Sequence, residues 1–153
     1  MTKDSLLALD NQLCFAVYAC SREISRLYRP LLDELGLTYP QYVTLLALWE
    51  EGEVTVKELG SLLFLDSGTL TPMLKRMETA GLIRRRRSSE DERKVLIGLT
   101  EEGEALKERV RCIPETLFQK SGVPAEEFHD LLERLQGLQQ QIRLLNTSNT
   151  HKE

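Results

Sequence analysis

The sequence predicts a mainly α-helical protein that carries one small β-hairpin. Aromatic residues make up only 6% of the chain, while Leu, Glu, Arg and Gln are frequent, as is typical of helical proteins. Apolar residues recur at three- and four-residue steps over most of the length. Only Val95, Ile97 and Leu99 alternate with other residues, which indicates a half-buried strand. At 153 residues and 41% apolar content, the chain has the size of one domain with its own core.

The first 35 residues predict one long helix, over about residues 5–35. Its broad apolar face comprises Leu6, Leu9, Leu13, Ala16, Val17, Cys20, Ile24, Leu27 and Leu31. So wide a face is more than a single neighbouring helix can cover. We therefore expect part of it to contact a partner subunit.

Two capping boxes predict the next helices. Thr38 with Gln41 starts a helix that ends near Gly52, and Thr55 with Glu58 starts a short one that ends around Leu63. Each pair lets a hydroxyl and a carboxamide or carboxylate satisfy N–H groups that have no partner within the helix.

The segment 65–78 predicts a helix with one apolar and one polar face. Leu70, Leu74 and Met77, with Met73 beside them, would face the core. The other face carries Ser67, Thr69, Thr71, Lys75 and Arg76, short hydrogen-bonding groups followed by cations. These side chains suit the DNA major groove, where bases and phosphates are contacted together. An ordinary amphipathic surface helix is the alternative.

A β-hairpin with a charged tip follows this helix. Residues 82–87 include four consecutive arginines, residues 88–92 are polar, and residues 93–99 return as a strand. Two short helices joined by a tight turn and followed by such a hairpin make a winged helix-turn-helix, over about residues 38–100. The arginines are either a solvated face or, as we expect here, a phosphate or minor-groove contact.

The charge distribution favours localised contact with nucleic acid. The whole chain has a net charge of −4, whereas residues 75–94 carry eight cations and four anions, so the remainder carries −8. An acidic body with one basic sector predicts phosphate contact at that sector.

The last third predicts two further helices, broken near Pro114 and again at residues 121–124, with a frayed polar tail over 146–153. Helices 5–35 and 101–146 together carry more apolar surface than the helix-turn-helix can cover. We expect these helices to bury their apolar surface mutually in a two-fold homodimer, which would also place two recognition helices for a palindromic DNA site. The whole chain, 1–153, is predicted to be a single domain.

Several kinds of site and location are disfavoured. No apolar run reaches the roughly 18 residues of a membrane span, and no signal peptide is recognisable, so a cytoplasmic protein without membrane contact is expected. Cys14, Cys20 and Cys112 are odd in number and form no CxxC motif, which argues against a disulfide framework. His129 and His151 lie far from them in the sequence, so neither a metal site nor a cofactor is expected.

Four short strings resemble those of a known family. The string Asp91–Arg93, followed by a strand and then by Leu99–Gly103 (LTEEG), resembles the wing of the MarR family of winged-helix repressors. Three further strings resemble the OhrR branch of that family, which senses organic hydroperoxides: Asn11–Phe15 (NQLCF), Leu37–Tyr42 (LTYPQY) and Leu65–Arg76 (LDSGTLTPMLKR). The resemblance covers about residues 6–145.

This resemblance implies a redox switch. The sensor cysteine of the branch falls on Cys14, and the tyrosines that hydrogen-bond to its sulfur fall on Tyr28 and Tyr39, with Tyr18 as a further member. An organic hydroperoxide or another oxidant would convert the thiol to a sulfenic acid and then to a disulfide, and the repressor would leave its operator. The second sulfur is left open between Cys112 and a low-molecular-weight thiol. We assign Cys20 to the core.

For DNA contact at the wing we expect Arg86 and Arg93, and the resemblance suggests that Asp91 orients Arg93 through an ion pair. A regulator released by a small aromatic ligand is the alternative function. A thiol peroxidase is disfavoured, because no CxxC motif would resolve the sulfenic acid on each turnover. No enzymatic activity is therefore expected.

Overall fold

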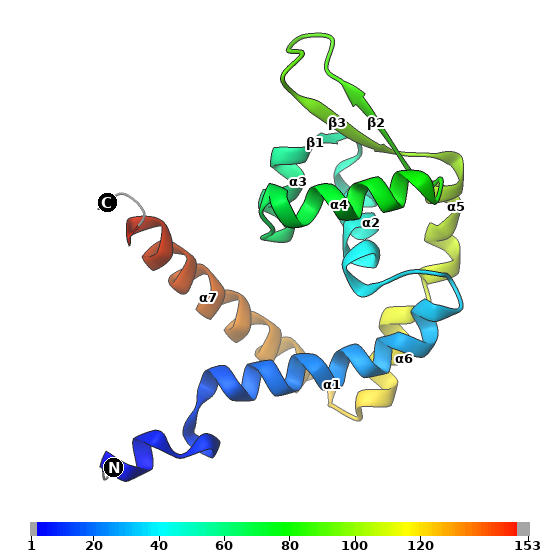
Figure 1. Cartoon of the computed structure of the whole chain (residues 1–153). Coiled ribbons are helices and arrows are strands. Elements are labelled where there is room, and N and C mark those ends of the chain that lie inside the picture. The colour runs from blue at the N-terminus through cyan, green and yellow to red at the C-terminus, as the bar shows by residue number, and fades with distance from the viewer. Residues whose placement is uncertain (1–2, 150–153) are drawn as a thin grey trace. The chain divides into compact units, whose positions relative to one another are not determined.

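The computed structural model describes residues 3–149, and its elements follow the predicted order (Figure 1). They are the 3-10 helices η1 (Lys3–Leu7) and η2 (Leu9–Asn11), the helices α1 (Leu13–Asp33), α2 (Tyr39–Glu51), α3 (Val56–Leu63), α4 (Ser67–Thr79), α5 (Glu101–Val110), α6 (Ile113–Ser121) and α7 (Ala125–Asn149), and the strands β1 (Val54–Thr55), β2 (Ile83–Arg87) and β3 (Val95–Leu99). The predicted fold class, mainly helical with a small β-hairpin, is confirmed. The chain divides into two compact units at Ile113 and Pro114. The single domain 1–153 stays a prediction.

The first long helix begins later than predicted. η1 and η2 occupy residues that the predicted helix 5–35 included, and Gln12 is extended, with φ −93° and ψ 106°. Asn11 Nδ2 donates to the carbonyl of Ser5 at 2.6 Å, and Gln12 Nε2 donates to that of Leu6 at 2.6 Å. These side-chain amides bond carbonyls that a continuous helix would use for its own ladder, which explains the break.

The helix-turn-helix consists of α2, α3 and α4, each of which starts at a capping side chain. Thr38 and Thr55 form the two predicted capping boxes. Asp66 Oδ1 accepts a hydrogen bond from Thr69 N at 2.8 Å and caps α4. Pro72 then lies in the second turn of α4, close to the predicted helix start.

The wing is part of a three-stranded antiparallel sheet in the order β1-β3-β2. β2 and β3 pair along their whole length, and their hairpin extends beyond α3 and α4 (Figure 1). β1 pairs with β3 through Val54 opposite Ile97. We did not predict β1, because two residues are too few to show the alternation of a strand.

The core of the first unit is formed by α2, α3, α4 and the sheet, which contact one another. Its fully buried side chains include Tyr42, Leu45, Leu48, Leu59, Leu70, Leu74, Met77, Ile83 and Ile97. α5 joins this core where Trp49 Nε1 donates to the carbonyl of Gly103 at 3.1 Å. A Cβ at Gly103 would lie 2.0 Å from the carbonyl oxygen of Leu82, so only glycine fits there.

The second unit contains α7 and most of α6. The rings of Phe118 and Phe128 meet edge to face, with centroids 5.5 Å apart. α7 continues to residue 149, so the prediction of a frayed tail from residue 146 is wrong over 146–149. Ser148 Oγ donates to the carbonyl of Leu144 at 2.8 Å, a bond that a helix can accommodate. Residues 150–153 lie outside the described part of the chain.

Candidate functional site

Cys14 is the second residue of α1, and its thiol is free and exposed. The predicted helix 5–35 would have placed it well inside a helix rather than in the first turn. The neighbouring Leu13, Phe15 and Val17 are also exposed. The Cys14 thiol is therefore open to a reagent and lies among apolar side chains.

Three tyrosines gather where α1 meets α2. The ring centroid of Tyr28 lies 5.0 Å from that of Tyr39 and 5.8 Å from that of Tyr42. Burial, and then the neighbouring Tyr39, raises the pKa of Tyr28. Burial, followed by the other two tyrosines, raises the pKa of Tyr42 to about 12. The hydroxyls of Tyr28 and Tyr42 therefore stay protonated at neutral pH and can donate hydrogen bonds.

Tyr42 was missed as a member of this cluster. It is also a buried residue of the core. Its position three residues after Tyr39 puts both rings on one face of α2, which is the signal that could have found it.

Cys14 and Tyr28 cannot meet within one chain. Both lie on α1, fourteen residues apart, which corresponds to about 21 Å along a helix. Tyr18 is one turn from Cys14, and Arg22 Nη1 donates to its hydroxyl oxygen at 3.2 Å. Because this bond uses the oxygen as an acceptor, the hydroxyl proton of Tyr18 remains available to another acceptor. We had not singled out Arg22, although its four-residue step from Tyr18 is a sequence signal.

The two other cysteines are exposed as well. The assignment of Cys20 to the core is wrong, because the buried residue of α1 is Leu32, near its C-terminal end, and the earlier turns lack cover within the first unit. Cys112 lies between α5 and α6, with its sulfur 3.9 Å from the carbonyl oxygen of Arg109. Its pairing with Cys14 stays a prediction.

α4 presents the two faces that the sequence predicts. The apolar face is buried and consists of Leu70, Met73, Leu74 and Met77. On the other face Ser67, Thr69, Lys75 and Arg76 are exposed and Thr71 is half-buried. The polar face is therefore free for a ligand, and its contact with DNA stays a prediction.

The arginine run of the wing is largely engaged in ion pairs. Arg85 Nε lies 3.3 Å from Glu78 Oε1, and Arg86 Nη2 lies 2.5 Å from Glu53 Oε1. Arg84 Nη2 is 4.0 Å from Glu53. Neither Glu78 nor Glu53 was predicted as a partner of these arginines. Glu53 reaches the wing only because the unpredicted strand β1 follows it directly.

The predicted pair at the wing tip is present. Arg93 Nε lies 3.3 Å from Asp91 Oδ1, which also accepts from the backbone N–H of Arg93 at 3.1 Å. The Arg93 side chain is 92% exposed. It is therefore oriented at its base by Asp91 and open to solvent at its end.

The described part of the chain, within residues 3–149, contains neither a membrane-spanning helix nor a metal-binding cluster. In that range no helix is both long and apolar enough to span a bilayer. Among the described side chains, those of residues 5–148, no group of three or more His, Cys, Asp or Glu residues is arranged to hold a metal ion. His151, named in the metal prediction, lies outside this range.

Comparison with known proteins identifies the family. Residues 26–110 match the family model described as transcriptional regulator SarA/Rot. The organic hydroperoxide resistance transcriptional regulator of Bacillus subtilis strain 168 is 54% identical over 140 residues, which covers 92% of this chain and 95% of that protein.

The similar solved structures are also transcriptional regulators. AbfR is a protein of Staphylococcus epidermidis. The structure of reduced AbfR bound to DNA is 37% identical in sequence and has a TM-score of 0.75, covering 95% of this chain and 99% of the AbfR chain. A disulfide form of AbfR is 39% identical, with a TM-score of 0.59 over 89% and 96% of the two chains. A mutant of Escherichia coli MarR in complex with operator DNA is 27% identical, with a TM-score of 0.76 over 82% and 92%. These relatives are regulators and not enzymes, and this chain belongs to the MarR family of winged-helix transcriptional regulators, in its OhrR branch.

Proposed function

We propose that this regulator is a homodimeric repressor that binds a palindromic operator and leaves it when an organic hydroperoxide oxidises Cys14. The observation that carries this proposal is the exposed thiol of Cys14 in the first turn of α1, within apolar surroundings. The relative named for organic hydroperoxide resistance and the disulfide form of AbfR support a redox signal.

Exposed apolar surface supports the dimer. Side chains more than one-third exposed include Leu13, Phe15, Val17, Ile24 and Leu27 of α1 and Phe128, Leu131, Leu132, Leu135, Ile142, Leu144 and Leu145 of α7. Each of the two helices therefore carries its own row of exposed apolar side chains, which monomeric proteins rarely leave in water. Burial between two copies would remove them from solvent and give two recognition helices related by a two-fold axis.

The dimer would also complete the sensor. Because Tyr28 cannot reach Cys14 of its own chain, the hydrogen bond to sulfur is assigned to Tyr28 and Tyr39 of the opposite protomer. Their cluster joins α1 to α2, the first helix of the helix-turn-helix, so a change at the sulfur could be transmitted to the DNA-binding helices. Tyr18, on the same helix face as Cys14, would add a further donor.

The oxidation proceeds in two steps. The Cys14 thiolate attacks one oxygen of the hydroperoxide, a sulfur–oxygen bond forms and the O–O bond breaks, and the leaving alkoxide takes a proton to become an alcohol. Cysteine is oxidised to sulfenic acid while the hydroperoxide is reduced. A second thiol, either Cys112 of the partner or a small cellular thiol, then attacks the sulfur, a disulfide forms and water leaves.

DNA contact is assigned to α4 and the wing. Ser67, Thr69 and Thr71 would meet base edges and Lys75 and Arg76 the phosphates. At the wing, Arg86 and Arg93 would contact the phosphates or the minor groove, with Arg93 oriented by Asp91. The exposed polar face of α4 and the exposed end of Arg93 support this assignment.

One titration separates this function from its alternative. The probe is a duplex carrying the palindrome that the wild-type protein selects from random-sequence DNA. We expect cumene hydroperoxide to release the protein at roughly stoichiometric amounts, and salicylate to leave it bound. Release by salicylate with no effect of the hydroperoxide would establish the aromatic-ligand alternative. Sustained turnover of hydroperoxide with a thiol reductant would instead identify a peroxidase.

The fate of the oxidised sulfur is tested at Cys112. Wild-type protein and a Cys112→Ser variant are treated with cumene hydroperoxide in the presence of cysteine and analysed by non-reducing gel electrophoresis and intact mass. We expect a mixed disulfide of unchanged yield in both proteins, because the added cysteine can attack the sulfenic acid of an exposed Cys14 without help from Cys112. A covalent dimer that disappears in the variant would show that Cys112 is the resolving cysteine.

Salt dependence tests the phosphate contacts. Because cations that neutralise phosphates release condensed counterions, affinity should fall steeply as salt rises, by roughly a thousandfold between 50 and 200 mM if about six phosphates are contacted per dimer. Fluorescence anisotropy over that range measures the slope. A nearly flat dependence would contradict a wing that grips the backbone.

A further inference from the structure

We propose that Glu53 is a positioning residue for DNA recognition, because its carboxylate clamps Arg86 and thereby fixes the wing against the helix-turn-helix. The inference rests on the proposed DNA contact of the wing. It assigns a role to an acidic residue that is not among the proposed DNA contacts, and it adds a positioning role to Arg86 of the DNA-contacting wing.

The clamp is a two-point contact. Arg86 Nε donates to Glu53 Oε2 at 3.1 Å, and Arg86 Nη2 donates to Glu53 Oε1 at 2.5 Å. Such paired bonds fix the relative orientation of both groups as well as their distance. The Glu53 side chain is 26% exposed and that of Arg86 is 50% exposed, so the pair is partly shielded from water. These hydrogen bonds also lower the pKa of Glu53, which keeps the carboxylate ionised at neutral pH.

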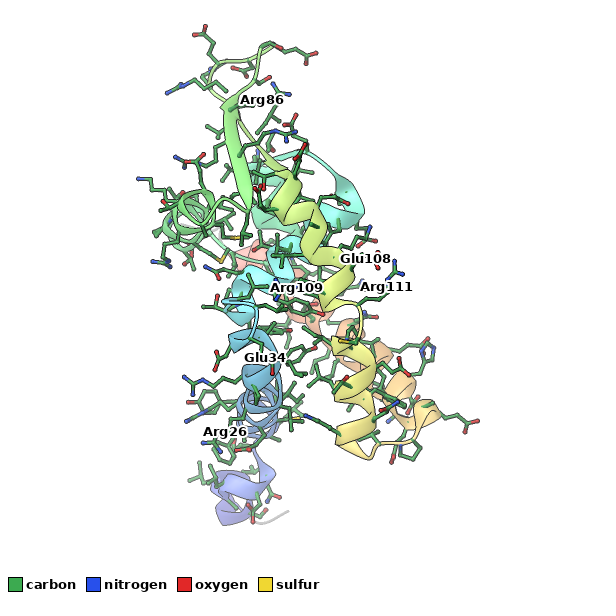
Figure 2. The ribbon with its side chains drawn as sticks, turned by 90° about the vertical axis from the view of Figure 1, so that its right-hand side faces the viewer. Arg26, Glu34, Arg86, Glu108, Arg109 and Arg111 are labelled. Atoms are coloured by element: carbon green, nitrogen blue, oxygen red, sulfur yellow. The ribbon has the colours of Figure 1, made fainter. Side chains whose placement is uncertain are left out.

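The pair spans the sheet. Glu53 directly precedes β1, Arg86 lies on β2 (Figure 2), and β3 runs between these two strands. The contact therefore ties the outer strand of the wing to the segment that links α2 to α3. Besides pairing through β3, the longer Arg84–Glu53 contact at 4.0 Å also joins this segment to β2, and Arg85 is held by Glu78 of α4. Loss of the two-point contact at Arg86 would therefore loosen the part of the hairpin beyond Arg85 relative to the helix-turn-helix.

Gly98 of β3 leaves space for the Glu53 side chain to reach across the sheet to Arg86. At Gly98 of β3, a Cβ would lie 3.1 Å from Glu53 Oε2 and 3.3 Å from Arg84 Nη2. A larger residue would push the carboxylate or the guanidinium away. Glycine weakens a strand interior and is expected where another group approaches closely. Here the approaching groups are the carboxylate of Glu53 and the second arginine, Arg84.

The clamp and a pure charge effect predict opposite changes in DNA affinity when Glu53 is replaced. Glu53 is an anion close to the surface that should meet DNA, so by Coulomb's law its removal should tighten binding and steepen the salt dependence. If Glu53 positions the wing, its removal should instead weaken binding, because the wing cations lose their alignment with the groove.

The test compares four variants with wild type on the selected palindromic duplex, by fluorescence anisotropy at several salt concentrations. We expect Glu53→Gln to weaken binding about threefold or more and to flatten the salt slope. Arg86→Lys, which keeps the charge but loses the two-point geometry, should weaken binding similarly. The double variant Glu53→Gln/Arg86→Lys should be no weaker than either single variant. Glu90→Gln, at the wing tip, removes a carboxylate that forms no ion pair among residues 3–149 and should bind at least as tightly as wild type.

Two measurements distinguish loss of the clamp from a general folding defect in the Glu53→Gln variant. Thermal unfolding of Glu53→Gln should stay within a few degrees of wild type, and cumene hydroperoxide should release it at the wild-type dose. Equal or tighter binding by Glu53→Gln, or additive effects of the two substitutions, would overturn the clamp. If the wild-type protein itself selects no duplex, the proposed function fails, and the clamp fails with it.

Discussion

Replacing Cys14 by serine is expected to leave DNA binding within about twofold of wild type and to abolish release by organic hydroperoxide. Serine differs from cysteine by one atom and occupies an exposed site, so the fold should not change. A hydroxyl cannot form a sulfenic acid, so the switch loses its reactive atom. Anisotropy of the protein–duplex complex during titration with cumene hydroperoxide measures both quantities.

Cys20→Ser is the matched control for Cys14→Ser. Both cysteines lie on α1 and both are exposed, but they are six residues apart and point to different sides of the helix. The control should therefore be released like wild type. Normal release of Cys14→Ser would remove Cys14 as the sensor, and resistance of Cys20→Ser would transfer that role.

Gly103→Ala is expected to destabilise the protein by roughly 3 kcal/mol or more. The added methyl group would lie 2.0 Å from the carbonyl oxygen of Leu82, a backbone atom that cannot move aside without shifting the start of β2. Moving α5 away instead would break the hydrogen bond from Trp49 to the carbonyl of Gly103. Equilibrium unfolding in urea measures the loss in the free energy of unfolding.

Gly137→Ala is the control for the glycine substitution. Gly137 lies within α7, and no atom outside its own helix backbone lies within 4 Å of a Cβ placed there. Alanine should be neutral or stabilise the helix by up to about 1 kcal/mol. A similar loss at both positions would show that the close approach to Leu82 does not decide the effect.

Local sequence determined where most helices start. Thr38, Thr55, Asp66 and Thr100 each cap the helix that follows, and the capping bonds lie within three residues of sequence. The faces of α4 were equally predictable, because the period of Leu70, Leu74 and Met77 fixes which side is buried. Such features depend on neighbours along the chain, so a single sequence contains all the information they need.

Only the tertiary structure decided the contacts made across the chain. The bond between Glu53 and Arg86 joins residues 33 positions apart and exists because β1 adds to the wing. The cluster of Tyr28 with Tyr42 likewise requires α1 and α2 to pack together. Even the position of Cys14 in the first turn of α1 depends on side-chain amides that interrupt a periodic apolar pattern. Periodicity shows which residues are buried, whereas long-range pairing and competing hydrogen bonds decide which of them meet.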